Sequence, residues 1–354
     1  MTIADRIHIT RRIGVPTWQT VLTRVLAIVA ALVASGLVML IMGFNPLEIY
    51  AQIVKSSVTS VRKLRETLNK TILLTVLSLG ISVAFRMKFW NIGAEGQFYM
   101  GSFGAALIAF GFPELQPALL LPLMGLSAFV FGGIWAVIPA LIKLKFTTSE
   151  TLVTLMMNYI AIAFIAYLES GPWKDPKGLG VAKIATFPDN ASMPTVFGIH
   201  AGWIITLVLV IVLTIMMKYS KFGYQIDVLG ESETTARYAG MNTVKVTLIA
   251  VLISGGLCGI GGYMQASALE HSITSQLSGG LGFTAVITAW LKPPIIVVVS
   301  FVFAMLLKSE VSLQALNMPS AITGIIQGVI IFFVLGSEFF INYRISLRKS
   351  VKEG

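Results

Sequence analysis

Trp90-Asn91-Ile92-Gly93-Ala94-Glu95-Gly96-Gln97 interrupts a long apolar part of the chain. Apolar sequence precedes this octapeptide from residue 71 to 85 and resumes after it from 98 to 110. A carboxylate and two amides between segments of membrane length are costly unless they lie in packed protein or line a cavity. Ionisable groups inside a membrane are therefore functional candidates. The octapeptide predicts a membrane protein with Asn91, Glu95 and Gln97 in a substrate pathway or gate.

The composition supports a protein that crosses the membrane several times. Of its 354 residues, 56% are hydrophobic and only 12% are charged, whereas a soluble domain carries about 25% charged residues. The 32 glycines suit closely packed membrane helices, and Gly255 and Gly259 form a G-x-x-x-G pair. The net charge of +10 comes from basic residues that flank apolar runs, which indicates membrane topology and not a nucleic-acid partner. We expect an all-α polytopic fold.

Ten apolar runs are predicted to be transmembrane segments, since a spanning helix needs about 20 apolar residues. The eighth and ninth are short and are separated by Lys292-Pro293-Pro294, where proline removes helical donors. The segments are 21–44, 67–85, 97–112, 118–141, 150–169, 202–217, 244–264, 283–291, 294–307 and 320–340.

Lysine and arginine are more frequent on alternate loops, which predicts ten crossings with both termini in the cytoplasm. The basic stretch from Lys55 to Lys70 falls on the outer side and is the main exception. We expect one transmembrane permease domain over residues 1–354. Its non-spanning parts are a cytoplasmic segment 1–20, an outer loop 170–201, a cytoplasmic coupling loop 218–243 and a cytoplasmic tail 341–354.

The sequence has no motif that indicates catalysis. It lacks the G-x-x-x-x-G-K-[ST] pattern of a P-loop and a nucleophile elbow. His8, His200 and His271 lie in separate segments without metal-ligand spacing. We therefore expect a transport subunit that is not an enzyme and that binds no cofactor of its own.

Three polar residues of the fifth segment share one helical face. Glu150, Thr154 and Asn158 are four residues apart, so they form a stripe. The stripe could line a polar pathway. It could equally well make hydrogen bonds between packed helices, which contribute about 0.6 kcal/mol each.

The coupling loop contains signals for a short helix. Ser232 can cap its start, Gly240 can end it, and Arg237 in the last turn suits the carbonyl end. Such a helix can sit in a groove of a partner, although an ordinary interfacial helix would look the same. The candidate contact residues are Glu231, Ser232, Thr235, Ala236, Arg237, Tyr238, Gly240, Met241 and Asn242.

These motifs together resemble one family over about residues 45 to 335. The octapeptide is similar to the N-I-G-x-E-G-Q element of bacterial ABC importer permeases for nucleosides, which are relatives of the ribose-type sugar permeases. Residues 150–161 and the G-P-W-K-D-P sequence at 171–176 are more typical of the nucleoside branch. Residues 236–241 resemble the second half of the family's coupling helix. The chain departs from the family pattern at 227–231 and 284–294.

The resemblance implies the membrane subunit of an ATP-driven nucleoside importer in the cytoplasmic membrane of a prokaryote. Implied partners are a second homologous permease, an ABC ATPase that holds ATP and Mg, an extracellular substrate-binding lipoprotein and membrane lipid, but no nucleic acid. The coupling residues would dock into the ATPase.

Two alternatives stay open. One is a permease of the same family for ribose-like or other simple sugars. The other is an ion-coupled secondary transporter, which normally places acids and bases within the membrane. Glu95 and Glu150 lie near predicted helix ends instead, and we expect Glu95 to act in an inner gate more than as a substrate ligand.

Overall fold

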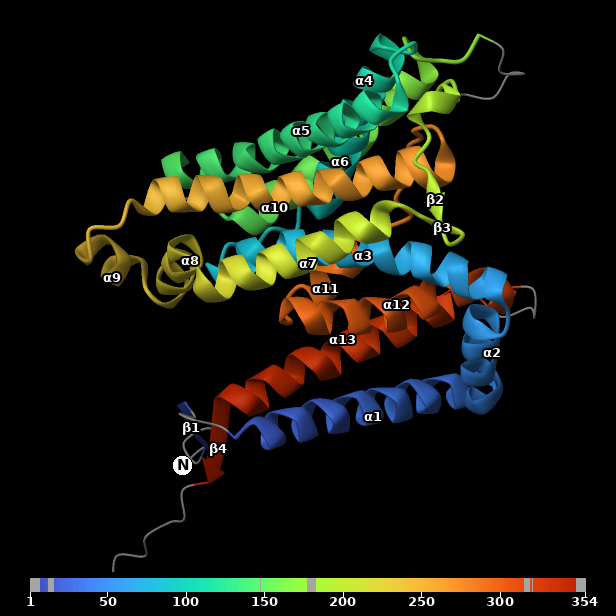
Figure 1. The fold of residues 1–354 in the computed structure, drawn as a ribbon. Helices are drawn as coiled ribbons and strands as arrows, with labels where there is room; N and C mark the ends of the chain where they lie inside the picture. The colour runs from blue at the N-terminus through green and yellow to red at the C-terminus, as the bar shows by residue number, and fades with distance from the viewer. Residues whose placement is uncertain are drawn as a thin grey trace, which may run out of the picture. The chain divides into compact units, whose positions relative to one another are not determined.

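A computed structural model describes residues 7–11, 16–146, 148–176, 183–314, 319 and 321–347, and these are mostly helical. Figure 1 shows the elements. The helices are α1 (Thr17–Ile41), α2 (Pro46–Val58), α3 (Val61–Arg86), α4 (Ala94–Gly111), α5 (Pro117–Phe146), α6 (Glu150–Ser170), α7 (Gly202–Tyr219), α8 (Lys221–Glu231), α9 (Glu233–Tyr238), α10 (Thr243–Gln265), α11 (Leu281–Thr288), α12 (Pro293–Gln314) and α13 (Ala321–Asn342). A π-helical turn, Ala266–Glu270, extends α10.

Each of the ten predicted segments coincides with a helix. Within the described residues, six helices are long and apolar enough to cross a membrane: α3, α5, α6, α7, α10 with its π-turn, and α12. The number rises to seven if α1 and α2, bent by 117°, count as one span. The all-α polytopic fold is confirmed, with fewer clear spans than the ten segments predicted.

The proline-broken pair differs from the prediction. The first member, α11, has eight residues and a length of about 12 Å, so it cannot cross a hydrocarbon core of about 30 Å. The second member, α12, has 22 residues and begins at Pro293. Proline fits the first turn of a helix because the amide there needs no intrahelical partner. Pro293 and Pro294 thus start a full-length helix, and only α11 is short.

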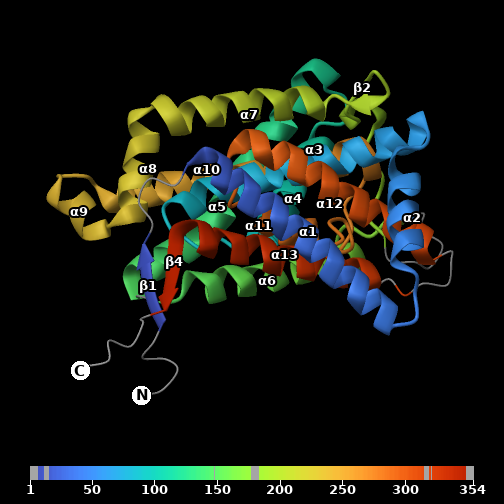
Figure 2. The same cartoon turned by 90° about the horizontal axis from the view of Figure 1, so that it is seen from below.

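The chain divides into two compact units, Met1–Lys63 with Met305–Gly354, and Leu64–Ala304. In the first unit, strand β1 (Ile7–Arg11) pairs antiparallel with β4 (Tyr343–Leu347), with Ile9 opposite Ile345. Figure 2 shows the two strands side by side. This pairing brings residues 7–11 beside residues 343–347, and ten crossings with both termini in the cytoplasm stay a prediction. A single permease domain stays a prediction.

Glycine contacts hold the core of the larger unit together. Helix α10 packs against α4 and α5, and a Cβ atom at Gly259 would overlap the carbonyl oxygen of Ala128 on α5. A Cβ atom at Gly255 would meet the side chain of Ala136 and the backbone of Gly132, both also on α5. The predicted G-x-x-x-G pair therefore serves close helix packing.

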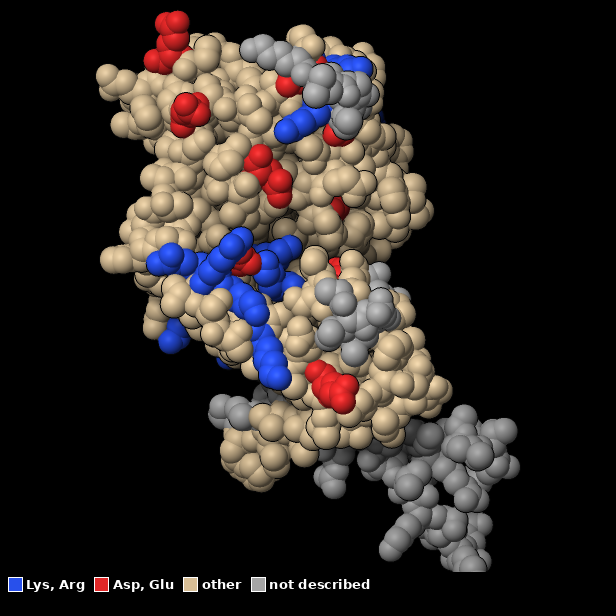
Figure 3. All heavy atoms as spheres, turned by 90° about the vertical axis from the view of Figure 1, so that its right-hand side faces the viewer, with Lys and Arg blue, Asp and Glu red and all other residues tan. Residues whose placement is uncertain are grey.

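The surface agrees with a position in lipid. Helix α7 exposes large apolar side chains along its length, among them Leu207 at 52% and Ile211 at 51%. Figure 3 looks along the helices at one end of the molecule, where Lys and Arg side chains gather within a largely uncharged surface. The protein is a multi-pass membrane protein.

The predicted outer loop contains a small hairpin over residues 195–200. Strand β2 (Thr195–Val196) pairs with β3 (Ile199–His200) across a turn in which Phe197 and Gly198 have positive φ. His200 is 1% exposed, and neither ring nitrogen has a hydrogen-bond partner among the described residues. Burial lowers the pKa of His200 to about 4, so the imidazole is neutral in the folded protein.

Acid should therefore destabilise the fold through His200. Between pH 6.5 and 4 the unfolded chain binds a proton that the folded chain does not, so the free energy of unfolding should fall by about 3 kcal/mol as the pH drops. Thermal unfolding in detergent across this range measures the effect. His200→Gln should flatten it, and His271→Gln, at an exposed histidine, should leave it unchanged. An equal acid effect in His200→Gln would contradict this assignment.

Candidate functional site

A compact turn joins α3 to α4 and contains the octapeptide. Asn91 and Gln97 bind each other through both amides, with Asn91 Nδ2 to Gln97 Oε1 at 3.1 Å and Gln97 Nε2 to Asn91 Oδ1 at 2.8 Å. Asn91 Oδ1 also accepts from the Gly93 amide at 3.1 Å, and Asn91 Nδ2 donates to Ser254 Oγ on α10 at 3.0 Å. The turn is thus closed by its own side chains and attached to α10.

The polar stripe of α6 binds this turn. Asn158 Oδ1 accepts from the Gly96 amide at 2.8 Å, and Asn158 Nδ2 donates to the Ile92 carbonyl at 2.9 Å. The Ile92 amide donates to Thr154 Oγ1 at 3.3 Å. Two sequence motifs about sixty residues apart therefore form one hydrogen-bonded clasp, which we define as residues 90–97 with Glu150, Thr154 and Asn158.

An ion pair lies at one end of the clasp. Lys143 Nζ on α5 is 2.8 Å from Glu150 Oε1 and lies over the ring of Phe89, 5.2 Å from its centroid. The Trp90 amide points at the same carboxylate oxygen from 3.5 Å. The side chain of Glu150 is only 12% exposed, so Lys143 supplies the charge that permits its burial.

Glu95 binds the start of α11. Its Oε2 accepts from the Gly282 amide at 2.8 Å, and the side chain is 2% exposed. A carboxylate suits the first turn of a helix because the free amides carry partial positive charge. A Cβ atom at Gly282 would lie 2.5 Å from the Glu95 amide nitrogen, so glycine is needed for this approach.

Tyr99 is a site residue that the sequence analysis missed. It lies one turn after Glu95 on α4, and its hydroxyl donates to the Ser275 carbonyl at 2.8 Å and accepts from the Ser278 amide at 3.2 Å. The spacing of four residues from Glu95 was the available signal. Glu95 and Tyr99 together hold the segment that leads into α11.

The other end of α11 is held by aromatic rings. The ring centroid of Trp290 lies 4.7 Å from that of Phe85 on α3 and 5.0 Å from that of Trp90 in the clasp. At the last residue of α11, the Thr288 hydroxyl contacts that of Ser78 on α3. Helix α11 is therefore attached to α4 at its start and to α3 at its end.

The predicted pathway residues are brought together, but they face each other. Asn158 is 0% exposed, Asn91, Gln97 and Thr154 are 1%, and Glu95 is 2%. Their polar atoms are satisfied within the clasp or by α10 and α11. In this conformation the stripe makes helix-to-helix hydrogen bonds, and its role in a pathway or gate stays a prediction.

The coupling loop contains two helices, of which the sequence analysis expected one. Ser232 caps α9 by accepting from the Thr235 amide at 3.2 Å, and Gly240 follows the helix with φ of 74°. Arg237 Nη2 lies 2.6 Å from Glu233 Oε1. The predicted cap, helix and end are confirmed.

The additional helix, α8, joins this loop to α3. Arg86 Nη1 lies 3.4 Å from Asp227 Oδ1. A Cβ atom at Gly230 would overlap the Arg86 carbonyl oxygen, so α8 lies directly against the end of α3. The remaining predicted contact residues, Thr235, Ala236, Tyr238, Met241 and Asn242, lie on or beside α9. Tyr238 is 96% exposed, Ala236 is buried, and Asn242 caps α10.

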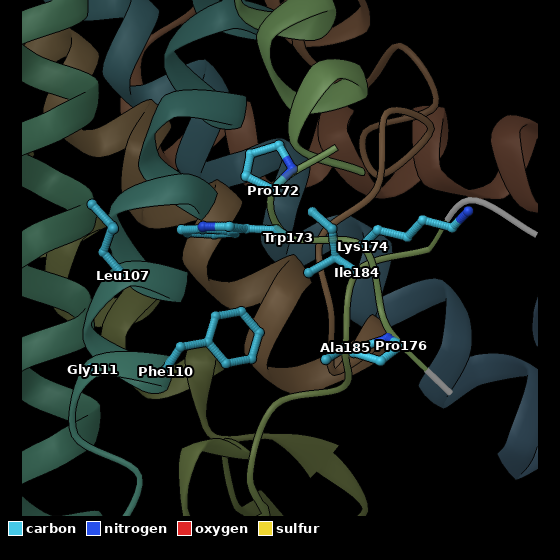
Figure 4. Close-up of a pocket in the computed structure, with 9 residues that line it drawn as sticks. All are labelled: Leu107, Phe110, Gly111, Pro172, Trp173, Lys174, Pro176, Ile184 and Ala185. Atoms are coloured by element: carbon cyan, nitrogen blue, oxygen red, sulfur yellow. The ribbon is translucent and has the colours of Figure 1, made fainter. Parts of the chain in front are cut away.

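A separate cavity of about 520 Å³ opens beside the end of α4, and Figure 4 shows its lining. The wall is apolar apart from Lys174 and includes Phe110, Trp173 and Ile184. Trp173 stacks on Phe103 with ring centroids 5.3 Å apart. Four residues of the G-P-W-K-D-P sequence line this cavity, namely Pro172, Trp173, Lys174 and Pro176, and none of the clasp residues does. Within the described residues, no cluster of His, Cys, Asp or Glu side chains could hold a metal ion.

The clasp geometry makes a distinct prediction for Glu95. Glu95→Gln keeps an oxygen that can accept from the Gly282 amide, so transport should largely survive. Glu95→Ala leaves that buried amide unpaired, at a cost of about 1–3 kcal/mol, and should abolish transport. Substrate uptake by the assembled transporter measures both. Equally normal uptake in the two variants would show that the contact has no mechanical role.

The comparisons with known proteins place the chain in a family. The family model described as "Branched-chain amino acid transport system / permease component" matches residues 64–335. A glucose ABC transporter permease protein of Haloferax volcanii is 29% identical over 94% of this chain and 92% of its own length. A guanosine ABC transporter permease protein of Bacillus subtilis is 29% identical over 89% of this chain and 93% of its own length.

A nucleoside ABC transporter permease protein of Lactococcus lactis is 25% identical over 94% of this chain and 95% of its own length. The family match covers well over half of the chain and coincides with the helical bundle and the clasp. The chain belongs to the branched-chain amino acid transport system permease family and is a membrane permease subunit of an ABC transporter.

Proposed function

We propose that this chain translocates nucleosides as one permease of an ATP-driven importer. The observation that carries the proposal is that relatives named for guanosine and for nucleosides match 89% and 94% of the chain. The octapeptide resembles nucleoside permeases, and residues 150–161, which supply the other half of the clasp, are more typical of the nucleoside branch. Residues 171–176, also typical of that branch, lie beside the separate cavity. The proposal therefore rests in part on the same residues that organise the inner part of the bundle.

ATP is hydrolysed on a partner chain in this proposal. The sequence has no P-loop, and α9 offers a small exposed surface to a partner. Tyr238 and the Glu233–Arg237 pair are on that surface, while Ala236 is buried beneath it. A partner ATPase that closes on α9 would push α8, and α8 would act on α3 through Arg86 and Asp227. Helix α3 leads directly into the clasp.

The complex also requires further partners in this proposal. Bacillus subtilis and Lactococcus lactis each have a second relative of this chain, 27% and 22% identical, also named as guanosine and nucleoside permeases. Two related permeases in one organism support a heterodimer with a second homologous permease. An extracellular substrate-binding lipoprotein would deliver the nucleoside, as the family resemblance implies.

A second candidate function is import of a simple sugar. The Haloferax volcanii relative is named for glucose and matches as well as the others do. Both solutes present sugar hydroxyls, so a polar pathway alone does not separate them. Within the described residues, we see no mid-membrane acid–base relay that would favour an ion-coupled transporter.

Uptake by the reconstituted complex tests the substrate. In proteoliposomes with the ATPase, the second permease and the binding protein, radiolabelled guanosine should accumulate only with ATP. Unlabelled uridine or adenosine should compete, whereas glucose and ribose should not. Accumulation of glucose without guanosine would overturn the nucleoside proposal and favour the sugar.

The coupling surface has its own test. Arg237→Glu places two carboxylates four residues apart on α9 and reverses the charge offered to the ATPase, so ATPase co-purification and transport should both be lost while membrane insertion persists. The matched control is Glu233→Arg combined with Arg237→Glu, which restores the pair within the helix. The control should stay inactive if the surface charge matters. Full activity in the single variant would refute the docking role.

A further inference from the structure

A non-helical segment lies deep in the larger unit, between the π-turn and α11. Residues 271–280 run alongside α4, because Ser275 and Ser278 bind the Tyr99 hydroxyl and Gly282 binds Glu95. Tyr99 is the sixth residue of α4 (Ala94–Gly111). The segment therefore reaches as far into the bundle as the second turn of α4. π-Turns such as Ala266–Glu270 are often found at functional sites.

One side of this segment is fully occupied by the protein. The Ser275 amide donates to Glu169 Oε2 on α6 at 3.1 Å, and Ser272 Oγ donates to the Ile184 carbonyl at 3.1 Å. Leu277 and Ser278 are buried. Backbone without helical hydrogen bonds is tolerated at membrane depth only where protein surrounds it or water reaches it.

Among the side chains that stay exposed in and after this segment are one amide and two aromatic rings. Gln276 is exposed, although the amide of Ser275 before it is hydrogen-bonded to Glu169 and Leu277 after it is buried. Phe283 on α11 is 38% exposed, and Trp290, two residues beyond the end of α11, is 39% exposed. A glutamine amide facing lipid at this depth would lose its hydrogen bonds to water. Its exposure in this chain therefore favours water or a polar partner beside it over lipid.

We propose that Gln276, Phe283 and Trp290 form a re-entrant strip that contacts the nucleoside during translocation. This inference rests on the proposed function and names the residues that would meet its substrate. The Gln276 amide offers both a donor and an acceptor to the polar edge of the base. The aromatic rings offer faces on which a planar base stacks without regard to its identity. Residues 284–294 depart from the usual family sequence, and Trp290 lies among them.

Cysteine labelling tests the strip with little background. Cys258 is the chain's only cysteine and is 0% exposed, so the native protein should not react with a charged methanethiosulfonate reagent. Gln276→Cys and Phe283→Cys are introduced singly into the assembled complex, and co-purification of the ATPase checks assembly. Ile211→Cys is the matched control, because Ile211 is 51% exposed on the apolar face of α7. Ile211→Cys should be inert if that face contacts lipid.

Both strip variants should react, and guanosine should protect them during turnover. When the guanosine concentration is about tenfold above the Kd with which guanosine binds the strip, the labelling rate should fall about tenfold. If neither strip variant reacts with the reagent, as is expected of the control Ile211→Cys, the inference is overturned. The strip would then face lipid or the second permease. Labelling without protection in a preparation that transports guanosine would also overturn it. Protection by glucose, in a preparation that transports only glucose, would refute the nucleoside substrate and leave the strip as the contact surface.

Discussion

The absence of water from the membrane core is the constraint on which this structure depends, because each break in a helix must satisfy its own polar groups. The chain breaks its helices at residues 87–93 and 271–280. The first break is closed by the clasp, in which Asn158 supplies both a donor and an acceptor to the turn. The second is closed by Glu95 and Tyr99. The two breaks meet at α4.

This meeting makes α4 the centre of the larger unit. Glu95 is buried with its carboxylate on the start of α11, and Tyr99 holds the segment before it. After α11, the ring of Trp290 packs against Phe85 on α3 and against Trp90 in the clasp. Displacement of α3 by α8 would therefore move the clasp and α11 together, provided these contacts persist. That is the physical basis on which we propose that ATPase closure reaches the substrate path.

The site was partly predictable. The octapeptide and the α6 stripe were recognised because amides and a carboxylate are conspicuous in apolar sequence, and the cap at Ser232 followed from local rules. That the stripe binds the octapeptide was not predictable, since no local rule pairs residues about sixty positions apart. Tyr99 was missed because a tyrosine in an apolar helix is ordinary. Helix α8 was missed although local signals for it exist: Lys221–Glu231 is amphipathic, and Ser220 caps its start by accepting from the Gly223 amide.

The sequence by itself determined the class of protein, the places where membrane helices form and the family. These follow from apolar length, charge placement and motif order, which are local properties. Only the tertiary structure decided that α11 is too short to span, that Pro293 begins a helix, and that residues 7–11 and 343–347 pair as β1 and β4. It also decided which polar residues are buried and that Gln276 is exposed. These outcomes depend on which distant segments share a face, and hydrogen-bond satisfaction in a dry interior selects that arrangement.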